Sequence, residues 1–228
     1  MLADLEKTEL TLGGLDERLL ALKSRYAKAA STLGAARRGA ARKLANAVTG
    51  LMRQLGMSGG RFEIAVESDA GSEPQAAGAD RIEFRVSANP GEPVKPVSKV
   101  ASGGELSRIS LAVQVASARR APRTCLIFDE VDAGIGGGVA EIVGRRLREL
   151  GERGQVLCVT HLAQVASQAH HQYRVSKLTD GRTSRTTITA LGAGERVEEL
   201  ARMLGGVEVT RKAREHAREM LKAAVAGS

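Results

Sequence analysis

Two uninterrupted apolar segments most constrain how this chain can fold. Residues 124–128 (TCLIF) and 155–159 (QVLCV) each run into polar residues, and a helical pattern at 138–150 separates them. Short apolar runs joined through a helix are typical of neighbouring strands in a parallel sheet covered on both faces. The sequence therefore predicts an α/β layer whose two strands are buried on both sides.

A glycine run precedes another helical pattern, at residues 103–119. Ser102 and Glu105 fit the S-x-x-E capping box, which starts a helix. The first N–H groups of a helix are unsatisfied and carry partial positive charge, and Gly103 and Gly104 let a ligand approach the backbone closely. The run is therefore either an anion site suited to phosphate or a plain helix cap.

Two carboxylates, Asp129 and Glu130, follow the first apolar segment. Ligands of open α/β sheets bind at the carboxyl ends of the strands. A carboxylate there can hold Mg²⁺ through water, and Glu130 can orient or deprotonate an attacking water. A strand end with solvated acids is the alternative, although two consecutive carboxylates favour a functional interpretation.

His161 follows the second apolar segment and should lie at the same sheet edge as the acid pair. Its imidazole can donate to a γ-phosphate or help to place a water, and a purely structural histidine is the alternative. No lysine in the chain follows a glycine, so the phosphate loop G-x-x-x-x-G-K-[ST] is absent. The sequence therefore predicts part of a nucleotide site.

The N-terminal segment, residues 1–57, carries two interleaved heptad series. Their members are Leu5, Leu12, Leu19, Tyr26 and Leu33, with Leu15, Leu22, Ala29 and Ala36 as companions. This spacing predicts a coiled-coil arm helix whose partner this sequence does not supply; an ordinary amphipathic helix is the alternative.

Two further divisions follow the arm. Residues 58–100 predict two strands, 61–67 and 81–88, and an extended loop with three prolines at 89–99. Residues 101–228 hold the α/β layer, strands at 173–177 and 185–190, and helices at 162–169, 194–204 and 209–225. We expect the last division to be the functional head.

The formal net charge of +8 favours an anionic partner such as nucleic acid. The basic side chains gather in three clusters: Arg37, Arg38, Arg42 and Lys43; Arg145, Arg146 and Arg148; and Arg211, Lys212, Arg214, Arg218 and Lys222. Such clusters predict salt-sensitive contacts with a DNA backbone, and solvated helix faces are the alternative.

The two cysteines and the length of the apolar runs indicate in which cellular compartment the protein works. Cys125 and Cys158 lie inside the apolar segments, which favours reduced core thiols in the cytosol. No apolar run approaches the roughly 18 residues of a membrane span, so no membrane partner is expected.

Three segments together resemble the second half of an ABC-type ATPase head, and most closely the RecN family of SMC-like DNA double-strand-break repair ATPases. They are 100–108 (VASGGELSR), 127–132 (IFDEVD) and 159–166 (VTHLAQVA). The resemblance implies the C-terminal lobe of such a head, a parallel sheet with flanking helices preceded by a coiled-coil arm helix.

The same resemblance implies a role for each motif residue. The signature residues Ser102, Gly103, Gly104 and Glu105 would grip ATP bound to a partner head. Asp129 would serve Mg²⁺, Glu130 would be the catalytic base, Asp132 would belong to the D-loop, and His161 would sense the γ-phosphate.

The implied cofactors are ATP and Mg²⁺, and the implied partners are an N-terminal half carrying the Walker A loop, a second head in a homodimer, and DNA. The resemblance also implies a cytoplasmic, nucleoid-associated protein whose present segment is inactive alone. An ABC transporter subunit is an alternative, although those heads lack a heptad arm and usually have Gln where Glu105 stands. A non-catalytic, basic coiled-coil adaptor is another.

Overall fold

The computed structural model describes residues 2–69, 71, 73–100, 102–117, 125–179, 184–205 and 208–226, without the side chains of 2–13, 178, 179 and 184. Its helices are α1 (Leu2–Gln54), α2 (Gly103–Ser117), α3 (Gly137–Gly151), α4 (Ala163–Ala166), α5 (Ala193–Gly205) and α6 (Arg211–Ala226), with a 3₁₀ turn at Val97–Lys99. Its strands are β1 (Arg61–Ser68), β2 (Asp80–Ser87), β3 (Lys95–Pro96), β4 (Cys125–Phe128), β5 (Gln155–Cys158), β6 (Tyr173–Thr179) and β7 (Ser184–Ala190).

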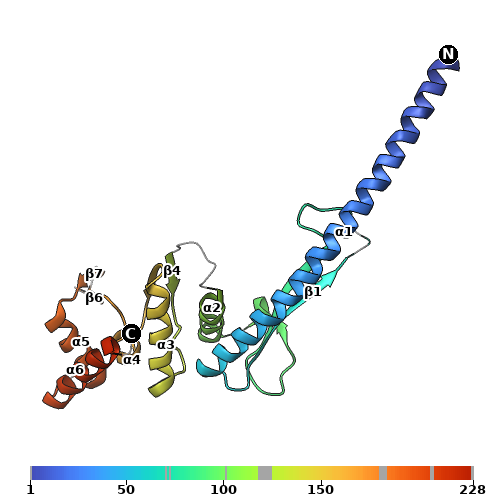
Figure 1. Ribbon diagram of the computed structural model, residues 1–228. Helices are drawn as coiled ribbons and strands as arrows, with labels where there is room; N and C mark the ends of the chain where they lie inside the picture. Colours follow the sequence, from blue (N-terminus) through green and yellow to red (C-terminus); the bar gives the residue numbers. More distant parts are fainter. Residues whose placement is uncertain are drawn as a thin grey trace.

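Helix α1 projects far beyond the rest of the molecule, with the N-terminus at its free end (Figure 1). The described heptad leucines Leu15, Leu19, Leu22 and Leu33 are between 39% and 56% exposed, so this stripe is uncovered. The side chains of Leu5 and Leu12 lie outside the described residues. The last turns of α1 instead enter the core, where the side chains of Val48, Met52 and, one residue after the helix, Leu55 are fully buried.

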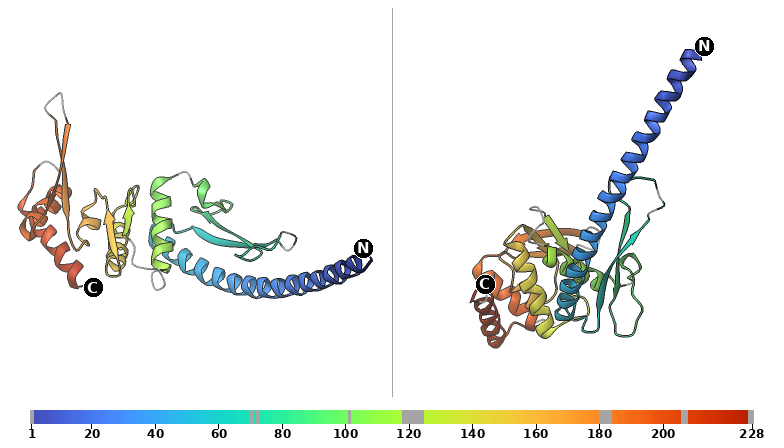
Figure 2. Two further views of the ribbon diagram at one scale, coloured as in Figure 1. Left: turned by 90° about the horizontal axis from the view of Figure 1, so that it is seen from above. Right: turned by 45° about the vertical axis from the view of Figure 1, so that its right-hand side comes forward.

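The antiparallel hairpin β1–β2 lies along the lower half of α1 (Figure 2). Phe62 on β1 is buried against α1, and its backbone N–H donates to Thr49 Oγ1 at 3.0 Å. Its ring lies edge-on to that of Phe84, with the ring centroids 5.4 Å apart. Both predicted strands of this hairpin are confirmed.

The predicted extended loop at 89–99 is wrong in part. Residues 95–96 form β3, which pairs with β2, and residues 97–99 form the 3₁₀ turn. Pro96 can occupy this position because an edge strand does not require its N–H as a donor.

Strands β4 and β5 form a two-stranded parallel sheet, with Cys125 opposite Gln155 and Phe128 opposite Cys158. Phe128 is buried in the core that α1, α2 and α3 share. The other face is open: Ile127 is 71% exposed and Val159 63%. The prediction of burial on both faces is therefore wrong for the described chain, because nothing in it packs on that side.

The cysteines follow the same division between the two faces. Cys125 is exposed, so its assignment to the core is wrong, whereas Cys158 is partly buried, and both are free thiols. Burial raises the pKa of the Cys158 thiol to about 12, and the charges of Asp132 and Asp129 add to this effect. Cys158 is therefore a protonated, unreactive thiol at neutral pH.

A second, smaller core joins α4, α5 and α6 around Leu200, Ala201 and Ala217. These helices agree with their predicted ranges to within a few residues, as do β6 and β7. The β6–β7 hairpin extends away from this core (Figure 2). None of the described helices is long and apolar enough to cross a membrane.

Candidate functional site

The start of α2 lies against the acid pair. Ser102 Oγ accepts the N–H of Glu105 at 3.4 Å, which is the serine half of the predicted capping box. A Cβ placed on Gly103 would lie 2.6 Å from Glu130 Oε2, so the carboxylate occupies the space that a side chain would need. The glycine run and Glu130 are thus brought together.

The acid pair is exposed at the carboxyl end of β4. Asp129 Oδ1 accepts the N–H of Glu130 at 2.9 Å, and the carbonyl oxygen of Asp129 accepts the hydroxyl of Ser107 at 2.7 Å. Glu130 has a φ of +55°, a conformation that no other described non-glycine residue adopts. Such backbone strain is concentrated at functional sites, where it aims a side chain.

Asp132 fastens the ends of β4 and β5 to each other. Its buried carboxylate oxygen Oδ2 accepts hydrogen bonds from the Thr160 hydroxyl at 2.5 Å and from the backbone N–H of His161 at 3.1 Å. The same oxygen lies 3.3 Å from the ring nitrogen Nδ1 of His161. The His161 ring itself is 73% exposed. The imidazole and the acid pair therefore lie at the same sheet edge.

Arg108 ties α2 to the loop that contains Asp132. Its Nη1 donates to the carbonyl oxygens of Ala133 at 2.7 Å and Val131 at 3.5 Å. Burial lowers the pKa of Arg108, and Glu105 partly opposes that shift. The sequence pattern assigned no role to Arg108, Ser107 or Thr160, although the charged residue at 108, next to the apolar Ile109, was a signal that could have found the first of them.

The carboxylates at the end of β4 suit a Mg²⁺ ion that is held by few protein ligands, and they do not suit a metal ion enclosed by side chains. Among the residues that the structure describes, no three His, Cys, Asp or Glu side chains gather as a metal cage. Asp129 uses Oδ1 in the bond to Glu130, and its exposed carboxylate retains capacity for a ligand. Mg²⁺ commonly takes one or two carboxylates and completes its shell with water and phosphate oxygens, so Asp129 fits that role.

Several residues of the predicted DNA-binding clusters have internal partners. Arg37 pairs with Asp80 at 3.1 Å, Arg146 bonds to Glu149, and Arg148 donates to the carbonyl of Gln168. In the C-terminal cluster, Arg211 pairs with Glu215 and Arg214 with Glu198. The contacts of Arg37, Arg148 and Arg214 join separate segments of the fold, which favours structural roles for these side chains. The pairs Arg146–Glu149 and Arg211–Glu215 lie within α3 and α6.

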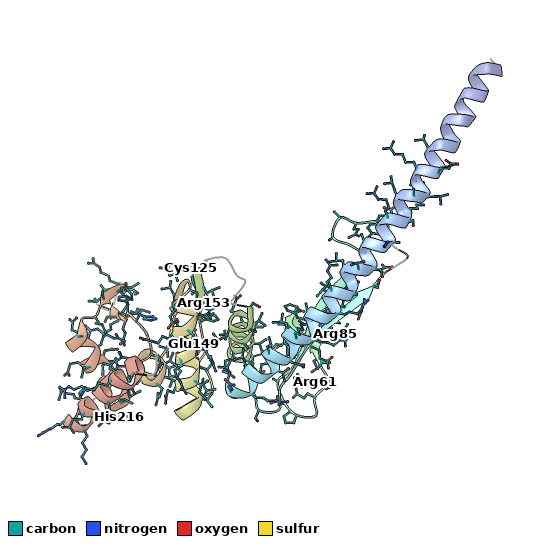
Figure 3. The ribbon with its side chains drawn as sticks, in the orientation of Figure 1. Arg61, Arg85, Cys125, Glu149, Arg153 and His216 are labelled. Atoms are coloured by element: carbon teal, nitrogen blue, oxygen red, sulfur yellow. The ribbon has the colours of Figure 1, made fainter. Side chains whose placement is uncertain are left out.

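The remaining cluster residues are more available to a partner. Arg38, Arg42 and Lys43 are exposed on α1, and Arg145 is exposed at 4.0 Å from Glu141. Figure 3 shows two further arginines, Arg61 and Arg85, on the hairpin beside α1, where they pair with hairpin glutamates.

Curated bacterial proteins named DNA repair protein RecN are similar to almost all of this chain. The protein of Xylella fastidiosa is 44% identical over 94% of the chain, and that of Deinococcus radiodurans is 46% identical over 96%. The protein of Haemophilus influenzae is 48% identical over 84%. The chain spans 38%, 38% and 34% of these relatives, respectively.

Among solved structures, the Smc head domain with a coiled coil and joint from Pyrococcus yayanosii shares the fold. It is 24% identical, has a TM-score of 0.50, and is matched over 70% of this chain and 28% of that one. No family model matches the chain. The α/β layer with its projecting arm helix therefore has the fold of that Smc head domain.

Proposed function

Because the chain belongs to the RecN family, of whose relatives it spans little more than a third, we propose that it forms the C-terminal part of an SMC-like ATPase acting in DNA double-strand-break repair. The observation that carries the proposal is the gathering of Glu130, Asp132 and His161 at one sheet edge, beside the start of α2. A non-catalytic adaptor requires no such assembly. An ABC transporter subunit would require it, but the long arm helix α1 argues against a transporter.

In this proposal the hydrolytic water lies between Glu130 and the γ-phosphate of ATP. Glu130 accepts the proton of that water, and His161 donates toward the γ-phosphate from the neighbouring strand. Asp129 would hold Mg²⁺, which neutralises phosphate charge when it is bound. Asp132 acts through Thr160 and His161, so we assign it a positioning role.

The start of α2, where Ser102 and Gly103 are exposed, serves a different ATP. Ser102, Gly103 and Gly104 offer a hydroxyl and first-turn N–H groups to the γ-phosphate of ATP on a second head, and Glu105 closes the cap. Each site then needs two heads in a homodimer. An N-terminal half of the same protein would supply the Walker A loop, because this sequence has none.

We further infer that the protein is cytoplasmic and nucleoid-associated, and that it binds DNA through contacts with the phosphates. The net charge of +8 supports such contacts, with Arg38, Arg42 and Lys43 as the available candidates on α1. We further propose that this segment alone does not hydrolyse ATP, since it lacks the loop that holds the phosphates.

Glu130→Gln in the intact protein tests the catalytic assignment. We expect ATP turnover to fall by roughly 10²-fold or more while ATP is still bound, because the amide keeps the shape but cannot accept the proton. Glu141→Gln, which neutralises an exposed carboxylate on α3, is the matched control. Turnover that survives Glu130→Gln unchanged would contradict the assignment.

A further inference from the structure

A cavity of about 320 Å³ lies among the C-terminal helices, away from the acid pair. The end of α3, the segment after α4, the start of α5 and the last turns of α6 line it, and it is open to solvent. Its lining residues are Arg148, Ser167, Ala169, His170, His171, Arg196, Leu221, Ala224 and Val225. Two arginines and two histidines line it, and none of the described lining residues is acidic, so the cavity is suited to an anion.

Both arginines are held in place by backbone carbonyls of one short segment. Arg196 donates through Nη2 to Ala169 at 2.8 Å and through Nη1 to His170 at 3.3 Å. Arg148 donates through Nη1 to Gln168 at 2.8 Å. The two guanidinium groups are therefore fixed beside each other before any ligand arrives, which lowers the entropic cost of binding.

One donor in this group lacks an acceptor. Arg196 Nε is buried and has no hydrogen-bond partner in the part of the chain that the structure describes. Buried polar atoms in native proteins are almost always paired, so Arg196 keeps unused hydrogen-bonding capacity among the described residues, although Nε itself is closed to solvent.

The electrostatics of the cavity indicate the charge of a suitable ligand. The pKa of His170 is lowered, first by burial and then by the positive charges of Arg148, His171 and Arg196, while Glu152 opposes the shift. The pKa of Arg196 is lowered by burial and by Arg148. Cations that disfavour one another in a concave site would be stabilised by a shared anion.

We propose that this cavity binds the terminal phosphate group of a phosphate ester. The arginine pair matches the charge and the several acceptor oxygens of a phosphate. The side formed by Leu221, Ala224 and Val225 is apolar and can contact the body of the ester. The volume lies at the lower end of the range for small-molecule pockets, which fits a compact ligand. The phosphate belongs either to a free metabolite or to a DNA 5′ end.

The first test is a calorimetric titration of the intact protein with inorganic phosphate. Val225 is 69% exposed at the cavity, so Val225→Glu adds an opposing charge with little effect on folding, and Val225→Gln is its neutral control. Arg153→Gln removes an exposed cation that follows α3 by two residues and does not line the cavity; Arg153 is labelled in Figure 3. We expect saturable binding that Val225→Glu weakens by about tenfold or more and that the two controls leave unchanged.

Two further arms identify the source of the phosphate and check the site. Duplex DNA with a 5′-phosphate is compared with the same duplex ending in a hydroxyl. If the 5′-phosphorylated duplex binds more tightly and Val225→Glu removes that difference in affinity, the phosphate belongs to a DNA end. If the two duplexes bind equally while inorganic phosphate still binds, the phosphate belongs to a free compound. In NMR, saturating phosphate should raise the pKa of His170. Absence of saturable binding, or an equal loss from Arg153→Gln and Val225→Glu, would overturn the proposal.

Discussion

The contact between Gly103 and Glu130 makes a prediction that separates catalysis from stability. In Gly103→Ala the new Cβ would lie 2.6 Å from Glu130 Oε2, so the carboxylate must retreat by roughly 0.8 Å to reach an ordinary contact near 3.4 Å. Glu130 is exposed, so this retreat costs little folding free energy. Alanine near the helix start also has less chain entropy to lose than glycine.

We therefore expect Gly103→Ala to leave the melting temperature of the intact protein unchanged or slightly raised. ATP turnover should fall by about 10- to 100-fold, because displacements near 1 Å at a reacting group cost rates of that order. Thermal unfolding and steady-state ATP hydrolysis measure the two effects on the same preparation.

Two glycines provide matched controls for this experiment. Gly138 lies in α3, and a Cβ there would have no neighbour within 4 Å, so Gly138→Ala should leave both turnover and stability intact. Gly104 is buried, and a Cβ there would meet Ala133 Cβ at 2.9 Å. Gly104→Ala should therefore destabilise the protein by about 1–3 kcal/mol.

A double-mutant cycle then tests whether Gly103→Ala acts through Glu130. In a Glu130→Gln background the substitution should have little further effect on the residual single-turnover rate, because the displaced group is already inactive. Fully additive losses, or normal turnover in Gly103→Ala, would refute the argument that this glycine sets the position of the base.

Two other predictions concern the loops at the sheet edge and the C-terminal helices. Thr160→Val removes the hydroxyl that donates to Asp132, so we expect chemical denaturation to show a free energy of unfolding lower by about 1–3 kcal/mol, together with reduced ATP turnover. Thr160→Ser keeps the hydroxyl and should retain both stability and turnover. Equal behaviour of the two variants would contradict this. The folded-state pKa of His170 lies below its usual value of 6.5, so the unfolded chain binds the proton more readily and stability falls as the pH drops through 6.5 toward the folded-state pKa. His170→Asn should flatten the pH dependence of the melting temperature in that range, and an unchanged profile would exclude the histidine as its source.

The sequence by itself determined the elements and the placement of the motif residues. The apolar runs, the glycines and the heptad spacing each predicted a local structure that the chain adopts, because period and capping act over a few neighbouring residues. Parallel pairing of β4 with β5 then requires Asp129 and His161 to share an edge, as the order of strand and helix had indicated.

Only the tertiary structure decided which side chains support that edge and which faces stay open. The bonds of Asp132 to Thr160 and of Arg108 to Ala133 join residues more than twenty positions apart, and no local pattern encodes them. Apolar composition likewise cannot show what covers a strand, so Ile127 was expected inside and lies exposed. Burial depends on which segments pack together, and that is a property of the whole assembly of elements rather than of any one of them.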